Sequence, residues 1–335
     1  MEDVDRIEEV GMNEPLERIK HWLQHWDGDL MGSQGALLGL DIGSYGLRVV
    51  LADVQGHQVL SESRPLPQDG PERVVAEALD LIRSVLHQAG MQPQHLVRIG
   101  IGFGGPVDKH AGTTRLSHRA AGWEHFPLAA RFEEALDTPA LLDNDANLIA
   151  LAEATFGVGH NVQNLFYLHL SSGVGGGMVL DGRLYSGATS TAGEIGHAIV
   201  RYDGPPCSCG ARGHLESYLS VGGLLRRANE LGLRTDNLDD LFGESAIGRQ
   251  VLAEATELLG MMLANIVTVL DPEMIVLGGV VTRRGGESFL ATIQQRLTES
   301  LPPTMRRDVP VLASTFGFDS VAVGALALAA QSLRD

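Results

Sequence analysis

The stretch EIGHAIVRYDGPPCSCGARGHLE, residues 194–216, contains both cysteines of the chain and two histidines. Thiolates and imidazoles together form a ligand set that favours tetrahedral zinc. Gly210 and Gly213 permit the tight bends that would bring these side chains round one ion. Because protein ligands would fill all four positions, the predicted site is structural, with no place left for a catalytic water. The predicted zinc ligands are His197, Cys207, Cys209 and His214.

Chance grouping is the alternative, with two buried cysteines and two unrelated histidines, and the specific spacing disfavours it. Only one residue separates Cys207 from Cys209. A pair so close, in a chain with no other cysteine, favours metal ligands over a disulfide framework.

Two glycine-rich loops of one kind precede this stretch. The first is DIGSYG, residues 41–46, and the second is SSGVGGG, residues 171–177. Each connects two apolar runs that are typical of buried strands. Backbone N–H groups and hydroxyls in such turns can bind phosphate oxygens, and a carboxylate at the mouth can hold Mg²⁺. Ordinary hairpin turns are the alternative. The residues predicted to face the phosphates are Asp41, Gly43, Ser44, Ser172 and Gly173.

Other nucleotide-binding motifs do not fit the chain. The sequence has no Walker A motif. Residues 100–105, GIGFGG, match the glycine pattern of a dinucleotide fold, but residues 106–108, PVD, follow where that fold requires the start of a helix.

Strand and helix patterns recur in two halves of the chain. A hairpin meander is predicted over residues 36–66, followed by a helix over 71–90 and a strand over 96–102. A second hairpin is predicted over residues 164–187, and a later strand over 273–281. The fold class is therefore α/β, with two related lobes rather than one doubly wound sheet.

Residues 1–35 form a separate N-terminal extension. Asn13 is a suitable cap for a helix over residues 14–26, in which apolar side chains recur at three- and four-residue steps. This helix is expected to pack on the body of the protein or on another subunit. The alternative is that it is the remnant of a longer upstream segment.

Composition narrows the possible partners and location. The net charge of −17 disfavours binding of nucleic acid by this chain, although it does not exclude Mg-ATP held by local donors. No uninterrupted apolar stretch reaches the roughly 18 residues that span a bilayer. The acidic start lacks a signal-peptide pattern. We therefore expect a cytoplasmic protein.

The chain resembles the ROK family of sugar kinases and sugar-sensing regulators. Members carry E-x-G-H followed, after a gap, by C-x-C-G-x-x-G-[C or H]-x-E, and residues 194–216 match each fixed position. Most members have a third cysteine where this chain has His214. The resemblance covers about residues 36–335. Further family-like segments are LGLDIG, IGIGFGGPVD, GWEHFPLAARFEE, DNDANLIALAEATFG, SSGVGGGMVLDGRLYSG, DPEMIVLGGVV and VAVGALALA.

This resemblance implies a two-lobed, actin-like sugar kinase fold with sugar and ATP between the lobes. The implied small lobe comprises residues 36–140 and is completed by the C-terminal helix over 318–335. The implied large lobe comprises residues 141–317 and carries the zinc site. The family also suggests a homo-oligomer, a dimer or a tetramer.

Functional roles follow from the same resemblance. An aspartate at a helix start is by itself most often a cap, but Asp145 matches the family's catalytic base, which accepts the proton of the attacking sugar hydroxyl. Gly278 and Gly279 match the nucleotide side. The residues that match sugar ligands of the family are Asn144, Glu194, His197 and Glu216.

Two departures from the family bear on activity. The first phosphate loop of the kinases is D-x-G-G-T-K, whereas this chain has Tyr45 and Gly46 at the last two positions. Residues 117–121 also lack the asparagine that the kinases offer to the sugar. The predicted function is ATP-dependent phosphorylation of a hexose or N-acylated hexosamine, supported by Asp145. The alternative, favoured by the altered loop, is a non-catalytic sugar sensor that lacks its DNA-binding part.

Overall fold

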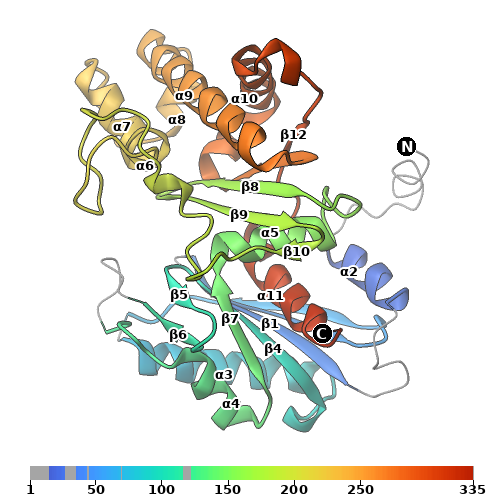
Figure 1. Cartoon of the computed structure of the whole chain (residues 1–335). Coiled ribbons are helices and arrows are strands. Elements are labelled where there is room, and N and C mark those ends of the chain that lie inside the picture. The colour runs from blue at the N-terminus through green and yellow to red at the C-terminus, as the bar shows by residue number, and fades with distance from the viewer. Residues whose placement is uncertain (1–14, 27–34, 44, 69, 116–121, 335) are drawn as a thin grey trace. The chain divides into compact units, whose positions relative to one another are not determined.

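The computed structural model describes residues 15–26, 35–43, 45–68, 70–115 and 122–334. The chain divides into two compact units (Figure 1). The first unit contains residues 1–160 and 315–335, and the second contains residues 161–314.

The first unit is built on a five-stranded sheet with strand order β3-β2-β1-β4-β7. Strands β1 to β3 form an antiparallel meander, while β4 and β7 continue the sheet in parallel with β1. The carboxyl ends of β1, β4 and β7 therefore meet at one edge of the sheet. The strands are β1 (Ala36–Gly43), β2 (Gly46–Asp53), β3 (Val59–Arg64), β4 (Leu96–Phe103) and β7 (Ala140–Asn144), with a small hairpin of β5 (Val107–Asp108) and β6 (Thr113–Thr114).

Helices cover both faces of this sheet (Figure 1). Leu38, Leu40 and Ile42 point to the face where α3 and α4 complete an apolar core. The opposite face carries α11, which lies along β1 and β4, with α5 beside it. The helices are α3 (Pro71–Gln88), α4 (Leu128–Leu136), α5 (Asp145–Thr155) and α11 (Ser320–Gln331), with 3₁₀ turns η1 (Pro93–His95) and η4 (Gly317–Asp319).

Glycines allow α11 to lie directly on the strands. A Cβ atom at Gly39 would stand 1.9 Å from the carbonyl oxygen of Ala322, and one at Gly100 would stand 1.9 Å from that of Ala325. No side chain larger than hydrogen fits at either position, because real Cβ contacts are never so short. The last helix therefore returns to the first unit as a close-packed part of its core.

The second unit repeats the same sheet order, β10-β9-β8-β11-β12. Along this order, as in the first sheet, two antiparallel strand pairs are followed by two parallel strand pairs. The repeated order supports the prediction of two related α/β lobes. The strands are β8 (Leu165–Leu170), β9 (Val174–Leu180), β10 (Arg183–Leu184), β11 (Met274–Gly278) and β12 (Val311–Ala313); the helices are α6 (Glu216–Leu219), α7 (Val221–Glu230), α8 (Asp239–Phe242), α9 (Ala246–Leu270) and α10 (Gly279–Ser300), with 3₁₀ turns η2 (Ile195–His197) and η3 (Pro303–Met305).

Strand β11 is shorter than the sequence predicts. We expected a strand over residues 273–281, but β11 ends at Gly278 and α10 begins at Gly279. Gly279 has a positive φ of 91°, a conformation that turns the chain sharply and favours glycine. The carbonyl of Gly278 then accepts a hydrogen bond from Thr282 Oγ1 at 2.9 Å, which belongs to the first turn of the helix.

The division into units places α5 in the first unit, whereas the sequence assigned residues from 141 onward to the second lobe. Helix α5 packs on α11, and a Cβ at Gly324 would stand only 1.8 Å from the carbonyl oxygen of Leu148. Because α11 lies on the first sheet, α5 stays with it, and the first unit continues to His160.

A buried glutamate ties the two ends of the first unit together. Glu153, on α5, accepts hydrogen bonds from the N–H and the hydroxyl of Thr315 at 2.6 and 2.9 Å. It also accepts one from the N–H of Val158 at 3.3 Å. Since Thr315 begins the returning segment, Glu153 joins the chain that leaves the first unit to the chain that re-enters it.

The N-terminal extension includes helix α2 (Pro15–Gln24), which packs on its own unit. The ring of Trp22 stands edge-on to Phe156 with centroids 5.1 Å apart, and the guanidinium of Arg334 lies 5.6 Å from the Trp22 centroid. Of the two packing partners that the sequence left open, the body of the protein is the one observed. The cap predicted at Asn13 lies outside the described residues.

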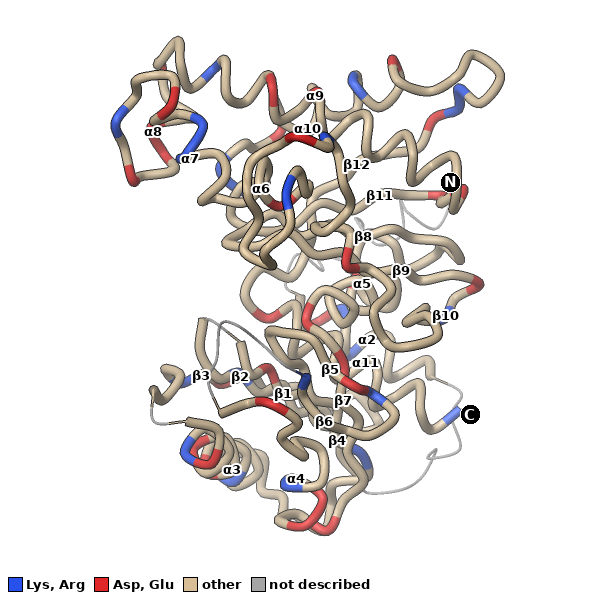
Figure 2. Tube along the Cα trace, turned by 60° about the vertical axis from the view of Figure 1, so that its left-hand side comes forward, with Lys and Arg blue, Asp and Glu red and all other residues tan. Residues whose placement is uncertain are grey.

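Within the described ranges, one helix, α9, is long and apolar enough to cross a membrane. The core helix of a folded domain meets the same description, and 56% of its apolar window is buried inside the structure. Figure 2 shows basic residues scattered among acidic ones along the described chain of both units.

Candidate functional site

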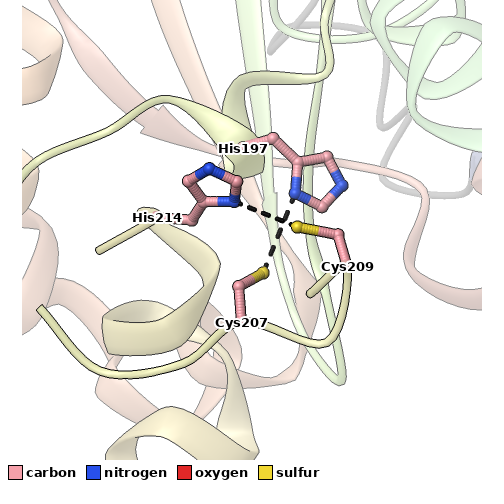
Figure 3. A group of neighbouring side chains, drawn as sticks. All are labelled: His197, Cys207, Cys209 and His214. Atoms are coloured by element: carbon pink, nitrogen blue, oxygen red, sulfur yellow. Dashed lines mark hydrogen bonds between the residues drawn. The ribbon is translucent and has the colours of Figure 1, made fainter. Parts of the chain in front are cut away.

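All four predicted metal ligands come together in the second unit (Figure 3). Their ligand atoms lie within 4.8 Å of one another. Cys207 Sγ is 3.9 Å from His197 Nδ1, and Cys209 Sγ is 3.3 Å from His214 Nδ1. A tetrahedral zinc ion separates its sulfur and nitrogen ligands by about 3.3–3.8 Å. The cluster therefore has the size and the chemistry to hold such an ion.

Two glycines shape the loop that carries these ligands. Gly210 and Gly213 have positive φ values of 92° and 70°. A Cβ at Gly213 would also stand 1.6 Å from the carbonyl oxygen of Arg201. The Cys207 N–H donates to the Ala211 carbonyl at 2.8 Å, which closes the bend. The tight turns predicted for these glycines are present.

Two residues predicted to bind sugar border this cluster. His197 uses Nδ1 toward Cys207, while its Nε2 lies 3.9 Å from Glu194 Oε2. One imidazole thus has one nitrogen at the metal cluster and the other beside an exposed carboxylate.

Glu216 is buried and bonded through both of its carboxylate oxygens. Oε1 accepts a hydrogen bond from Ser208 Oγ at 2.8 Å, and Oε2 accepts one from the N–H of Val174 at 3.0 Å. Ser208 lies between the two cysteines, and Val174 directly follows Gly173 of the second glycine loop. The carboxylate therefore joins the loop of the metal cluster to the second glycine loop. No sequence pattern indicates the bond from Ser208.

The second glycine loop lies beside the turn at Gly278 and Gly279. A Cβ at Gly279 would stand 2.1 Å from the carbonyl oxygen of Leu170, the last residue of β8. Ser172, in the loop, is exposed and available to a ligand. The predicted nucleotide residues of the second unit thus share one edge of its sheet.

A buried pair behind this edge was missed by the sequence analysis. Tyr167 Oη lies 2.7 Å from His169 Nδ1, and a Cβ at Gly278 would stand 2.2 Å from that hydroxyl. Burial, with a further contribution from Arg283, lowers the pKa of His169 to about 4. Tyr167 and His169 are two residues apart on β8, so their side chains lie on the same face of the sheet. This spacing is the sequence signal that relates them.

In the first unit, Asn144 and Asp145 lie where β7 meets α5. Asn144 caps the helix by accepting from the N–H of Ala146 at 2.9 Å, and its amide donates to the carbonyl of Gly105 at 3.0 Å. Asp145 Oδ1 accepts from the same Ala146 N–H at 2.8 Å. The other oxygen, Oδ2, faces Gly104, where an added Cβ would stand 3.7 Å away.

Asp41 shares this edge of the sheet with Asp145. It is buried, and its Oδ1 has no hydrogen-bond partner among the described residues. A Cβ at Gly43 would stand 2.8 Å from that oxygen, so a larger residue there would require the Asp41 carboxylate to move. Burial, followed by the charge of Asp145, raises the pKa of Asp41 to about 8, although Arg48 opposes the shift. A divalent cation would stabilise the ionised form of this carboxylate.

The first glycine loop carries an exposed aromatic side chain and a glycine with a positive φ. The ring of Tyr45 is exposed and packs edge-on against Phe318, with centroids 5.8 Å apart. Gly46 has a φ of 123°, and a Cβ there would stand 2.5 Å from the carbonyl oxygen of Arg64. A lysine at position 46 is therefore incompatible with this loop. Ser44 and residues 117–121 lie outside the described residues.

The predicted site residues thus form two groups, each within one unit. The first group consists of Asp41, Gly43, Asn144 and Asp145, and we call it the carboxylate half-site. The second, which we call the metal half-site, consists of Ser172, Gly173, Glu194, His197, Cys207, Cys209, His214, Glu216, Gly278 and Gly279.

The family model described as "ROK family" matches residues 37–332. Two curated proteins with different functions are similar to the chain. A glucokinase from Halalkalibacterium halodurans is 32% identical over 311 residues, which are 86% of this chain and 92% of that protein. A xylose repressor from Caldicellulosiruptor bescii is 28% identical over 283 residues, 79% of this chain and 70% of the repressor.

Solved structures give a similar result. A ROK hexokinase from Thermus thermophilus aligns with a TM-score of 0.81 and 30% identity, over 90% of this chain and 99% of that one. A ROK family glucokinase from Streptomyces griseus, in complex with glucose and AMPPNP, aligns with a TM-score of 0.72 and 27% identity. The alignment covers 89% of this chain and 100% of that one. The α/β sugar kinase fold is therefore that of the chain.

Proposed function

The chain belongs to the ROK family, and on that premise we propose that it is an ATP-dependent kinase of a hexose or an N-acylated hexosamine. In the proposed reaction, a sugar hydroxyl oxygen forms a bond to the γ-phosphorus of ATP. The bond between that phosphorus and the bridging oxygen of ADP breaks, and the hydroxyl proton passes to a carboxylate. The products are a sugar phosphate and ADP.

The observation that carries this proposal is the position of Asp145. A general base must lie within hydrogen-bond reach of the proton that it accepts. Asp145 stands at the carboxyl edge of the first sheet, and its Oδ2 faces glycine rather than a bulky side chain. Phosphoryl transfer asks little more of the protein than positioning and neutralisation of charge.

Sugar recognition is assigned to side chains of both half-sites. A sugar offers hydroxyls that both donate and accept, so carboxylates, an amide and an imidazole suit it. Glu194 and His197 are exposed in their unit and can reach a ligand. Glu216 already holds two protein donors, which fixes its orientation before sugar arrives. Asn144 is the fourth proposed sugar ligand.

Nucleotide binding is assigned to the two glycine loops and to the Gly278–Gly279 turn. When bound, Mg²⁺ would neutralise the charge of the phosphates. Asp41 is the residue proposed to hold it, directly or through water, because its buried Oδ1 lacks a protein donor among the described residues. The loop residues proposed to face phosphate are Gly43, Ser44, Ser172 and Gly173.

A structural zinc ion is proposed for the metal cluster. Four protein ligands bound to one tetrahedral ion would leave no open coordination position, which is typical of structural sites, and the four ligand atoms here lie within 4.8 Å of one another. Zinc bound by His197, Cys207, Cys209 and His214 would hold the loop of residues 197–214 in one conformation. Cytoplasmic location and assembly into a dimer or tetramer stay predictions.

One observation favours a second function, that of a non-catalytic sugar sensor. The loop at Gly46 excludes the lysine of the kinases, and Tyr45 replaces their threonine. Xylose repressors are also among the relatives of the chain. Sugar binding without phosphoryl transfer would be the property of such a sensor.

A coupled assay of ADP release separates the two functions. The purified protein, with Mg-ATP, is offered glucose, mannose, N-acetylglucosamine, N-acetylmannosamine and xylose, with a sugar-free control. The kinase proposal expects ADP release that depends on at least one of these sugars. Sugar binding by calorimetry without any sugar-dependent ADP release would support the sensor.

A further inference from the structure

Ser208 is an exposed residue between two metal ligands whose hydroxyl bonds to a buried carboxylate. Its Oγ donates to Glu216 Oε1 at 2.8 Å. The position of the hydroxyl depends on the backbone of the loop, which Cys207 and Cys209 would fix when both bind one ion. Any change in the metal cluster would therefore move the donor that Glu216 uses.

The other oxygen of Glu216 bonds to the phosphate loop. Oε2 accepts from the N–H of Val174 at 3.0 Å. On its other side, the Val174 carbonyl packs against Gly196, where an added Cβ would stand 2.0 Å away. The backbone of Val174, which directly follows Gly173, is thus held at its N–H by Glu216 and contacts the E-x-G-H segment through its carbonyl.

Backbone hydrogen bonds also hold the second glycine loop, one of them from Val221 at the start of α7. The Ser171 N–H donates to the Gly173 carbonyl at 2.9 Å, and the Val221 N–H donates to the Ser171 carbonyl at 2.9 Å. Loss of the bond between Glu216 and Val174 would free the peptide group that joins Gly173 to Val174, because this group carries the bonded N–H.

We propose that Ser208 is a positioning residue, which orients Glu216 so that one carboxylate serves both the sugar and the second glycine loop. The metal loop, the sugar ligand and the phosphate loop are then coupled through a single side chain. A hydrogen bond to a charged acceptor is worth more than one between neutral groups. The inference for sugar affinity rests on the proposed function, because it takes Glu216 to be a sugar ligand.

Ser208→Ala removes the donor while it leaves both cysteines in place. We expect unchanged metal content, a sugar Kd weakened by about tenfold, and faster hydrogen–deuterium exchange of residues 171–176. Ser208→Thr keeps a hydroxyl and should restore both properties. Arg212→Ala changes the same exposed loop but leaves the Ser208 hydroxyl, and it should match the wild type.

The two readouts separate this inference from the proposed function. If exchange of residues 171–176 and sugar Kd are the same in Ser208→Ala as in the wild type, the inference is wrong. If exchange rises in Ser208→Ala but the wild type binds none of the sugars tested, the positioning of Glu216 stands and the proposed function fails. Failure of Ser208→Thr to restore slow exchange would also overturn the inference.

Discussion

The two glycine loops occupy the same place in the two sheets and differ in chemistry. Each joins the two antiparallel strands, β1 to β2 and β8 to β9, that open a five-stranded sheet of common order. The first loop follows a buried carboxylate, Asp41, whose pKa is raised. The second carries the hydroxyls of Ser171 and Ser172 and receives its carboxylate, Glu216, from a distant segment.

The two loops are therefore suited to different ligands. A carboxylate with no hydrogen bond on one buried oxygen is suited to a cation, whereas hydroxyls and backbone donors are suited to phosphate oxygens. Of the two loops, the first departs from the kinases, at Tyr45 and Gly46, while the second keeps its hydroxyls. The choice between kinase and sensor therefore depends on the first loop and its neighbour Asp145.

The largest expected effect is in the metal half-site. Cys209 is exposed, so Cys209→Ser leaves no cavity, and any loss of stability reflects the metal. Purified protein should contain about one zinc per chain, measured by elemental analysis. Cys209→Ser should lose the metal and melt at a markedly lower temperature, because binding of structural zinc is coupled to folding.

The control for this prediction is the wild type treated with a chelator. Its melting temperature should fall to that of Cys209→Ser. A wild type that contains no metal after careful preparation, or that melts unchanged after chelation, would contradict the assignment.

A smaller effect is expected in the first loop. Threonine offers a compact hydroxyl close to the backbone, whereas the ring of Tyr45 is directed against Phe318. Tyr45→Thr should tighten Mg-ATP binding by about ten- to a hundredfold, the range for one hydrogen bond to a charged group. Calorimetric titration measures the change. Tyr45→Phe, which retains the ring, is the matched control and should not tighten binding.

The lysine of the family loop is left out of this test. Because an added Cβ at Gly46 meets the carbonyl of Arg64, Gly46→Lys is expected to destabilise the protein. Tight Mg-ATP binding by the wild type would show that the tyrosine does not weaken the loop.

A further expected effect concerns the pH dependence of stability. The pKa of Asp41 is about 8 in the folded state, against a usual value of 3.8. The folded protein therefore holds a proton that the unfolded chain loses, and stability falls as pH rises from about 4 to 8. The loss from this group is at most about 1.4 kcal/mol per pH unit within that window. Asp41→Asn should remove this part of the decline.

Urea unfolding at pH 5 and pH 8 measures the decline. Asp108→Asn is the control, because backbone hydrogen bonding lowers the pKa of Asp108, so its titration lies below this window. Equal pH dependence in the wild type and Asp41→Asn would contradict the account of Asp41.

Features set by short segments could be predicted from the sequence. The four metal ligands lie within residues 197–214, and glycines among them permit the bends, so local spacing was sufficient. The strands within residues 36–66, 96–102 and 164–187 were also visible as apolar runs. The family resemblance is confirmed by the match over residues 37–332.

Features set by packing over long separations could not be predicted. The assignment of α5 to the first unit depends on its contact with α11, which is distant in sequence. The bond from Ser208 to Glu216 depends on the fold of a loop whose exposed serine carries no pattern. Likewise, the exclusion of lysine at Gly46 follows from the carbonyl of Arg64, which is on another strand.

The most direct test of the central claim is the turnover of Asp145→Asn compared with its sugar affinity. The amide cannot accept a proton but can still form hydrogen bonds, so kcat should fall by about 10²- to 10⁴-fold while the sugar Kd changes little. Asp80→Asn, an exposed change on α3, should leave both unchanged. Full turnover in Asp145→Asn would contradict the claim that this carboxylate is the base of a sugar kinase.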